Sequence, residues 1–180
     1  MNSKTAVMAA VAASLLAFVA GCAHRAVPTT QPALGVGTAS AKPPASSRPA
    51  TCPAVLAGHT YPPASRGDMV PGTPDRATVC RYGGLNDPHP HSLVRSATVG
   101  TAPAVALAHT LNLGKAFPAG VPYNCPADLG LTDLVLFDFP DGHRVDVELD
   151  MSGCRTAANG ERVVFYPAAA AGQVTALVGR

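Results

Sequence analysis

The chain has 180 residues, a formal net charge of +2 and no tryptophan. The small charge and the absence of a basic cluster argue against nucleic acid as a partner. No G-x-S-x-G sequence and no glycine-rich phosphate loop occurs, so we expect neither a serine-hydrolase triad nor a bound cofactor.

Residues 1–21 have the layout of a secretory signal peptide. Lys4 provides a positive start, residues 6–20 are apolar except for Ser14, and small residues precede Cys22. The apolar run is shorter than the ~20 residues that a membrane span needs. A plain secretory signal with a chance cysteine is the alternative interpretation.

The four residues Val19-Ala20-Gly21-Cys22 resemble the lipobox of bacterial lipoproteins. This resemblance implies that the Cys22 thiol receives a diacylglyceryl group and that cleavage occurs directly before Cys22. Because two acyl chains give stable anchoring, we expect a protein held on the outer face of the cell membrane.

The other four cysteines are Cys52, Cys80, Cys125 and Cys154. An even number in an exported protein indicates disulfides, and four cysteines allow three connectivities. We favour Cys52–Cys80 and Cys125–Cys154, because each pair closes a loop of similar length, about 30 residues. A disulfide that closes such a loop stabilises the fold by about 3–4 kcal/mol. No C-x-x-C sequence supports a zinc site instead.

Composition divides the rest of the chain into a tether and a domain. Residues 22–50 are mainly Ala, Pro, Ser, Thr and Gly, which bury too little apolar surface to fold. We therefore expect a disordered tether there and a disulfide-stapled extracytoplasmic domain over residues 51–180.

The first elements expected in this domain are two strands and a helix. Residues 77–84 and 93–99 have the composition of short strands. Apolar side chains then recur at helical spacing, which predicts an amphipathic helix over residues 102–113 with Thr101 as its N-cap.

Residues 134–150 predict a β-hairpin around Pro140-Asp141-Gly142. A two-residue loop would pair Phe137 with Asp146 and mix apolar and charged side chains on one face. A three-residue loop, with Gly142 in a left-handed bulge, pairs Phe137 with Val145. We expect the three-residue loop, because a one-residue slip would turn the apolar face to water.

A third strand over residues 162–166 and a short helix over residues 167–178 complete the predicted elements. The expected fold class is α+β, with a small antiparallel sheet, one or two helices on one face and two disulfides.

The part of the chain after the tether resembles a group of exported actinobacterial proteins and lipoproteins, largely of unknown function. The resemblance covers "MVPGTPDRATVCRYGGL", "CPADLG", "FDFPDGHRVDVEL" and the "GC" and "ANG" that follow. These motifs consist of cysteines, turns and strands. The resemblance therefore supports the fold and the disulfide pairing and implies no catalytic residue.

A candidate metal site is the segment that contains Asp87, His89 and His91. An H-x-H pair beside a carboxylate suits zinc or copper. However, two prolines stiffen the segment and a further ligand is needed from elsewhere. The alternative is a solvated polar loop with turn-forming residues.

Acidic residues crowd the predicted hairpin. Paired carboxylates suit acid–base catalysis, but alternation with apolar residues is typical of the solvated face of a half-buried strand. The residues concerned are Asp138, Asp141, Asp146, Glu148 and Asp150.

Three functions remain open. The first is a lipid-anchored binding or interaction domain of the cell envelope, with an envelope protein, a cell-wall polymer or a small ligand as partner. The second is metal capture by the loop of His89 and His91, and the third is an envelope enzyme that uses the hairpin carboxylates.

Overall fold

The computed structural model describes residues 50–58, 67–118, 120 and 122–179. These residues belong to the unit Lys42–Arg180. The predicted signal peptide, Cys22 and the tether up to residue 49 lie outside the described residues. Within the described residues, no helix has the length and hydrophobicity needed to cross a membrane.

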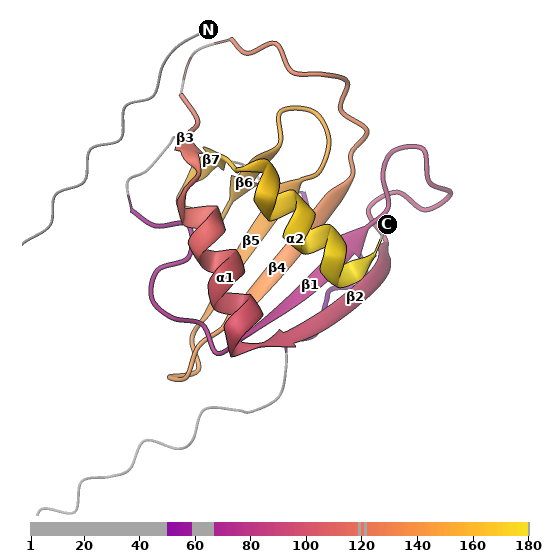
Figure 1. The fold of residues 1–180 in the computed structure, drawn as a ribbon. Coiled ribbons are helices and arrows are strands. Elements are labelled where there is room, and N and C mark those ends of the chain that lie inside the picture. Colours follow the sequence, from indigo (N-terminus) through magenta and orange to yellow (C-terminus); the bar gives the residue numbers. More distant parts are fainter. Residues whose placement is uncertain (1–49, 59–66, 119, 121, 180) are drawn as a thin grey trace, which may run out of the picture. The chain divides into compact units, whose positions relative to one another are not determined.

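The fold is an antiparallel seven-stranded sheet in the order β2-β1-β4-β5-β6-β7-β3, with two helices (Figure 1). This arrangement confirms the α+β class expected from the sequence. The strands are β1 (Arg76–Tyr82), β2 (Leu93–Gly100), β3 (Lys115–Ala116), β4 (Thr132–Asp138), β5 (Arg144–Asp150), β6 (Thr156–Ala158) and β7 (Val163–Phe165), and the helices are α1 (Thr101–Asn112) and α2 (Ala168–Val178).

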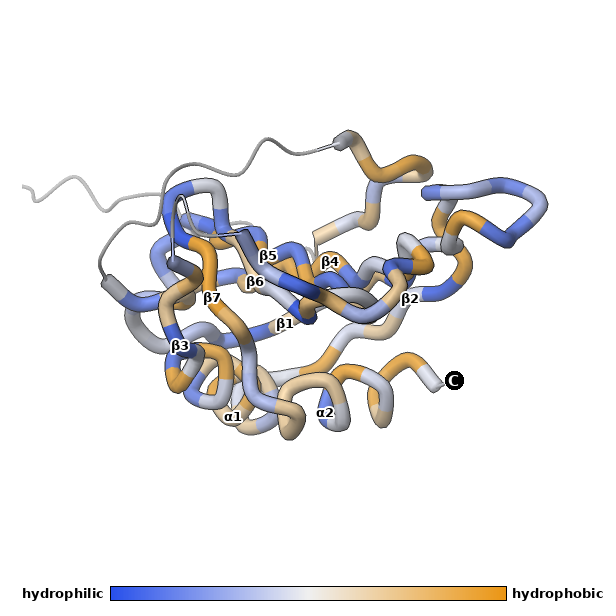
Figure 2. The backbone as a smooth tube through the Cα atoms, turned by 90° about the horizontal axis from the view of Figure 1, so that it is seen from above, coloured by the Kyte–Doolittle hydropathy of each residue, from blue (hydrophilic) through white to orange (hydrophobic). Residues whose placement is uncertain are grey.

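Both helices lie on the same face of the sheet (Figure 2). Alternate strand residues point toward them, because successive side chains of a strand face opposite sides. The main core lies between these two layers and includes Val79, Val135, Phe137, Leu107 and Val174. Most of its buried residues are alanine or valine.

The central hairpin has the predicted three-residue loop. Phe137 pairs with Val145, and the Gly142 N–H donates to the Phe139 carbonyl at 2.9 Å. Gly142 has φ 85°, a left-handed conformation that glycine adopts at little cost. The apolar match of the two strands therefore does determine the register.

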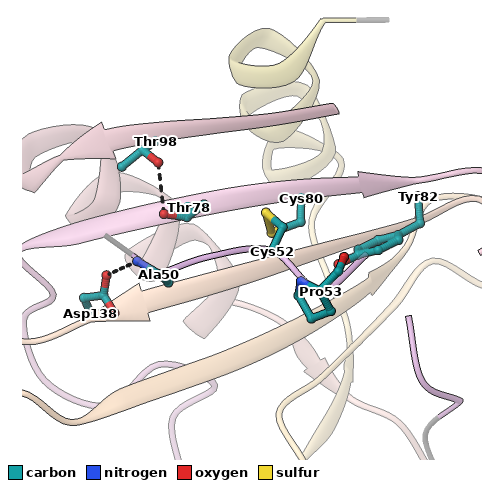
Figure 3. Close-up of a disulfide and its surroundings, with 8 residues drawn as sticks. All are labelled: Ala50, Cys52, Pro53, Thr78, Cys80, Tyr82, Thr98 and Asp138. Atoms are coloured by element: carbon teal, nitrogen blue, oxygen red, sulfur yellow. Dashed lines mark hydrogen bonds between the residues drawn. A yellow bond between two sulfur atoms is a disulfide. The ribbon is translucent and has the colours of Figure 1, made fainter. Parts of the chain in front are cut away.

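The opposite face of the sheet is covered in part by the segment that follows the tether (Figure 3). A disulfide joins Cys52 to Cys80 of β1, with a Cα–Cα distance of 5.7 Å. The Tyr82 hydroxyl donates to the Pro53 carbonyl at 3.0 Å, and the Ala50 N–H donates to Asp138 Oδ2 at 3.2 Å. Burial raises the pKa of Tyr82. The folded part thus begins by Ala50.

The second disulfide joins Cys125 to Cys154, with a Cα–Cα distance of 4.8 Å. It connects the loop before β4 to the turn after β5, and so it closes the open end of the hairpin. Both bridges match the pairing that the loop lengths favour.

Three local predictions need correction. The N-cap of α1 is Gly100, and Thr101 is the first helical residue, whose hydroxyl donates to the Asp75 carbonyl at 3.0 Å. The sequence analysis also missed β3 and β6. Strands of two and three residues are too short to show an alternating pattern, and β6 is Thr-Ala-Ala.

Candidate ligand-binding cleft

A cleft of about 920 Å³ lies between α2 and the sheet. One wall is the side of α2 that does not carry its buried residues, Ala170, Val174 and Val178. The other wall comes from the start of β4 and the turn after β5. The residues that line it are Arg81, Tyr82, Leu131, Thr132, Asp133, Met151, Arg155, Ala171, Gly172, Thr175, Ala176 and Gly179.

The wall formed by α2 consists of small side chains. Ala171, Gly172, Thr175 and Ala176 lie on one side of the helix, at the spacing that places residues on the same face. A Cβ atom added at Gly172 would meet no other heavy atom within 4 Å. Glycine inside a helix costs about 1 kcal/mol relative to alanine, and here it keeps the cleft wide.

The floor of the cleft contains an ion pair between Arg81 of β1 and Asp133 of β4. The guanidinium donates two parallel hydrogen bonds, Nε to Oδ1 at 2.9 Å and Nη2 to Oδ2 at 2.8 Å. The Asp133 side chain is fully buried, and that of Arg81 is 18% exposed. The hydrogen bonds that Arg81 donates to Asp133 raise the pKa of Arg81, although burial opposes this shift.

Two arginines hold the end of α2 against the sheet. Arg81 Nη1 donates to the Gly179 carbonyl, and Arg95 Nη1 donates to the Val178 carbonyl at 2.9 Å. These carbonyls have no partner within the helix, and the negative end of the helix dipole attracts cations. Because Arg81 and Arg95 face each other across β1 and β2, the two strands determine where α2 ends.

Arg155 lies at the rim of the cleft, on the turn between β5 and β6. It has φ 53°, a left-handed conformation that costs a non-glycine residue about 1–2 kcal/mol. It directly follows Cys154, so the second disulfide holds its backbone in place. Its side chain is exposed, and within the described part of the chain no hydrogen bond or ion pair of its guanidinium is found.

A buried tyrosine adjoins these charges. The Tyr166 hydroxyl donates to the Asp150 carbonyl at 2.8 Å. The pKa of Tyr166 is raised to about 12, mainly by burial; the charge of Arg155 lowers it, and the charges of Asp133 and Asp150 raise it. Tyr166 is therefore neutral at physiological pH and serves as a hydrogen-bond donor within the structure.

The candidate metal residues lie elsewhere, in the loop between β1 and β2 (Figure 1). The Asp87 carboxylate accepts a hydrogen bond from the Gly84 N–H, so it stabilises its own turn. Among the residues that the structure describes, no group of three or more His, Cys, Asp or Glu side chains is placed to hold a metal ion. Metal binding by His89 and His91 stays a prediction.

Two of the hairpin carboxylates are paired within the hairpin. Asp138 accepts a hydrogen bond from Arg144 Nε at 3.0 Å, and Asp141 pairs with His143 in the turn. Glu148 is only 9% exposed, so a fully solvated outer face is the wrong description of this strand. The reason is its central position, between Leu134 of β4 and Ala158 of β6.

No sequence pattern indicates the residues of the cleft. Arg81 and Asp133 are 52 positions apart, and only the pairing of β1 with β4 brings them together. One feature of the sequence does point to the cleft: Arg155 directly follows Cys154, which is expected to form a disulfide.

Comparisons with protein-family models, with curated proteins and with solved structures each give no match. The function must therefore be inferred from the chain's own residues and from the shape of the cleft.

Proposed function

We propose that the protein is a lipid-anchored binding domain of the bacterial cell envelope, and that the cleft under α2 binds a small molecule. The observation that carries the proposal is the cleft itself, with its wall of small side chains and the exposed cation Arg155 at its rim. Its volume of about 920 Å³ lies in the range of ligand pockets, about 300–1,000 Å³.

Two features favour binding over catalysis at this position. The buried carboxylate, Asp133, is engaged by both of its oxygens with Arg81. The hydroxyl of Tyr82, which also lines the cleft, already donates to the Pro53 carbonyl at 3.0 Å, and burial raises its pKa away from that of an effective general base. Among the described residues that line the cleft there is no cysteine, serine or histidine.

Filling the cleft is expected to remove the ligand without unfolding the domain. In Gly172→Leu the new side chain enters the cleft, while helix propensity improves by about 1 kcal/mol. Native mass spectrometry of the protein isolated from its own cells should show a non-covalent ligand on the wild type and none on Gly172→Leu.

The matched control is Ala169→Leu, an exposed position on the same helix that does not line the cleft. This variant should retain the ligand. A ligand that stays bound to Gly172→Leu, or a wild-type protein that carries none, would contradict binding in the cleft.

The anchor has a separate test. Cys22→Ala removes the only thiol that the lipobox resemblance assigns to acylation, so the variant should leave the membrane fraction for the soluble fraction. Cross-linking in intact cells, with this variant as the untethered control, would then reveal whether an envelope protein or a cell-wall polymer depends on the anchor. Wild-type protein in the soluble fraction would contradict the anchor.

A further inference from the structure

A second hollow adjoins the cleft. It has a volume of about 550 Å³ and lies between the loop before β4 and the turn that contains the second disulfide. Three residues line both spaces, namely Leu131, Met151 and Arg155. The two hollows therefore meet at Arg155.

The second hollow is mostly apolar and partly aromatic. Tyr123 and Phe165 line it, with ring centroids 5.0 Å apart. Phe117 packs against both rings. Tyr123 is nevertheless 50% exposed, so one side of this aromatic cluster is available for contact.

One cation, Arg155, lines both hollows at the shared rim. Arg81 is neutralised by Asp133, which leaves Arg155 as the cation that both hollows share. Two carboxylates lie nearby and have other partners: Asp150 accepts a hydrogen bond from the Thr156 hydroxyl, and Asp128 accepts one from the Ser152 hydroxyl at 2.6 Å. The Ser152 hydroxyl and the Gly130 N–H lower the pKa of Asp128, so it keeps its negative charge. An anion would therefore be held by direct contact with Arg155 and not by the net charge of the rim.

The position of Arg155 also favours recognition of a ligand. A left-handed residue other than glycine persists only where the surroundings hold it, and such strain concentrates at ligand-binding positions. Here the disulfide at Cys154 holds the backbone, while the exposed guanidinium retains its five donors for a planar anionic group.

We infer that the ligand is a small organic anion with an apolar body, such as a carboxylate or sulfonate. Its charged group binds Arg155, and its apolar part lies against Leu131, Met151 and the aromatic pair Tyr123 and Phe165. This inference rests on the proposed function, because it assigns the chemical class of the ligand to the same cleft.

The test compares two fluorescent probes that share an apolar body. The anion is 8-anilinonaphthalene-1-sulfonate, and the uncharged analogue is N-phenyl-1-naphthylamine. The mature chain should bind one sulfonate probe per molecule, more tightly than the amine. Arg155→Gln should lower the affinity for the sulfonate probe by about tenfold, because one charge-assisted interaction is lost. The affinity for the amine should not change.

Three controls make the outcome specific. Arg155→Lys keeps the charge and should restore part of the sulfonate affinity. Arg144→Gln removes an exposed cation of the hairpin, outside both hollows, and should change neither affinity. Thermal unfolding of each variant shows whether the fold is retained.

Two results separate the failure of this inference from the failure of the proposed function. If both probes bind equally and Gly172→Leu abolishes both, the cleft binds apolar molecules and the assignment of an anion is wrong. If neither probe binds, or if Gly172→Leu affects neither, both the anion and the cleft are wrong.

Discussion

Replacing Arg81 by methionine should lower the free energy of unfolding by about 3 kcal/mol or more, the range for breaking a buried ion pair. The variant leaves the Asp133 carboxylate fully buried without its two hydrogen bonds. It also removes the contact with the carbonyl of Gly179 at the end of α2. Urea denaturation followed by circular dichroism measures the loss.

The hairpin offers a matched control. Arg144 also pairs with an aspartate, Asp138, but its side chain is 43% exposed. Arg144→Met should therefore cost less than about 1 kcal/mol, as exposed ion pairs do. The double variant Arg81→Met with Asp133→Leu should regain much of the stability, because no uncompensated charge stays buried. Equal losses in the two single variants would refute a structural role for the pair under α2.

Removing the first disulfide with Cys52→Ala and Cys80→Ala should lower the free energy of unfolding by about 3–4 kcal/mol. The bridge closes a loop with a sequence separation of 28 and holds the segment from Ala50 to Leu56 on the sheet. Without it, Leu134 and Leu136 lose part of their apolar cover. Guanidinium denaturation under oxidising conditions measures the effect.

The second disulfide is a close control, because its sequence separation is 29 and its chain-entropy contribution is nearly the same. Removing Cys125 and Cys154 should cost no more than removing the first bridge. It should also weaken binding of the sulfonate probe, since Cys154 positions Arg155. Sulfonate binding that survives loss of the second bridge would show that the turn does not depend on it.

The features that could be predicted from the sequence were local. The register of β4 and β5 followed from the apolar match across a three-residue loop, and α1 followed from helical spacing within twelve residues. The disulfide pairing followed from loop lengths of similar size. For the hairpin and α1 the deciding residues lie close together in the chain, and each disulfide spans a sequence separation of only 28 or 29.

The cleft could not be predicted, because it depends on contacts between distant segments. In sequence, α2 begins with four alanines but also contains a glycine and three β-branched residues, which lower its helix propensity, and nothing in it indicates which side stays open. Its position follows from Arg81 and Arg95, two cations with no local partner. Likewise, Glu148 alternates as a solvated residue does, and only the neighbours in β4 and β6 show that it is buried.

The central claim is that the cleft between α2 and the sheet binds a small molecule, and amide chemical shifts test it most directly. The mature, unacylated chain would be titrated with 8-anilinonaphthalene-1-sulfonate and followed by ¹H–¹⁵N NMR. We predict that the largest shifts occur at Gly172 and Thr175 of α2, at Leu131 and at Arg155. Shifts concentrated in the segment from Ala50 to Leu56 or in β2, or no shifts at saturating probe, would contradict the claim.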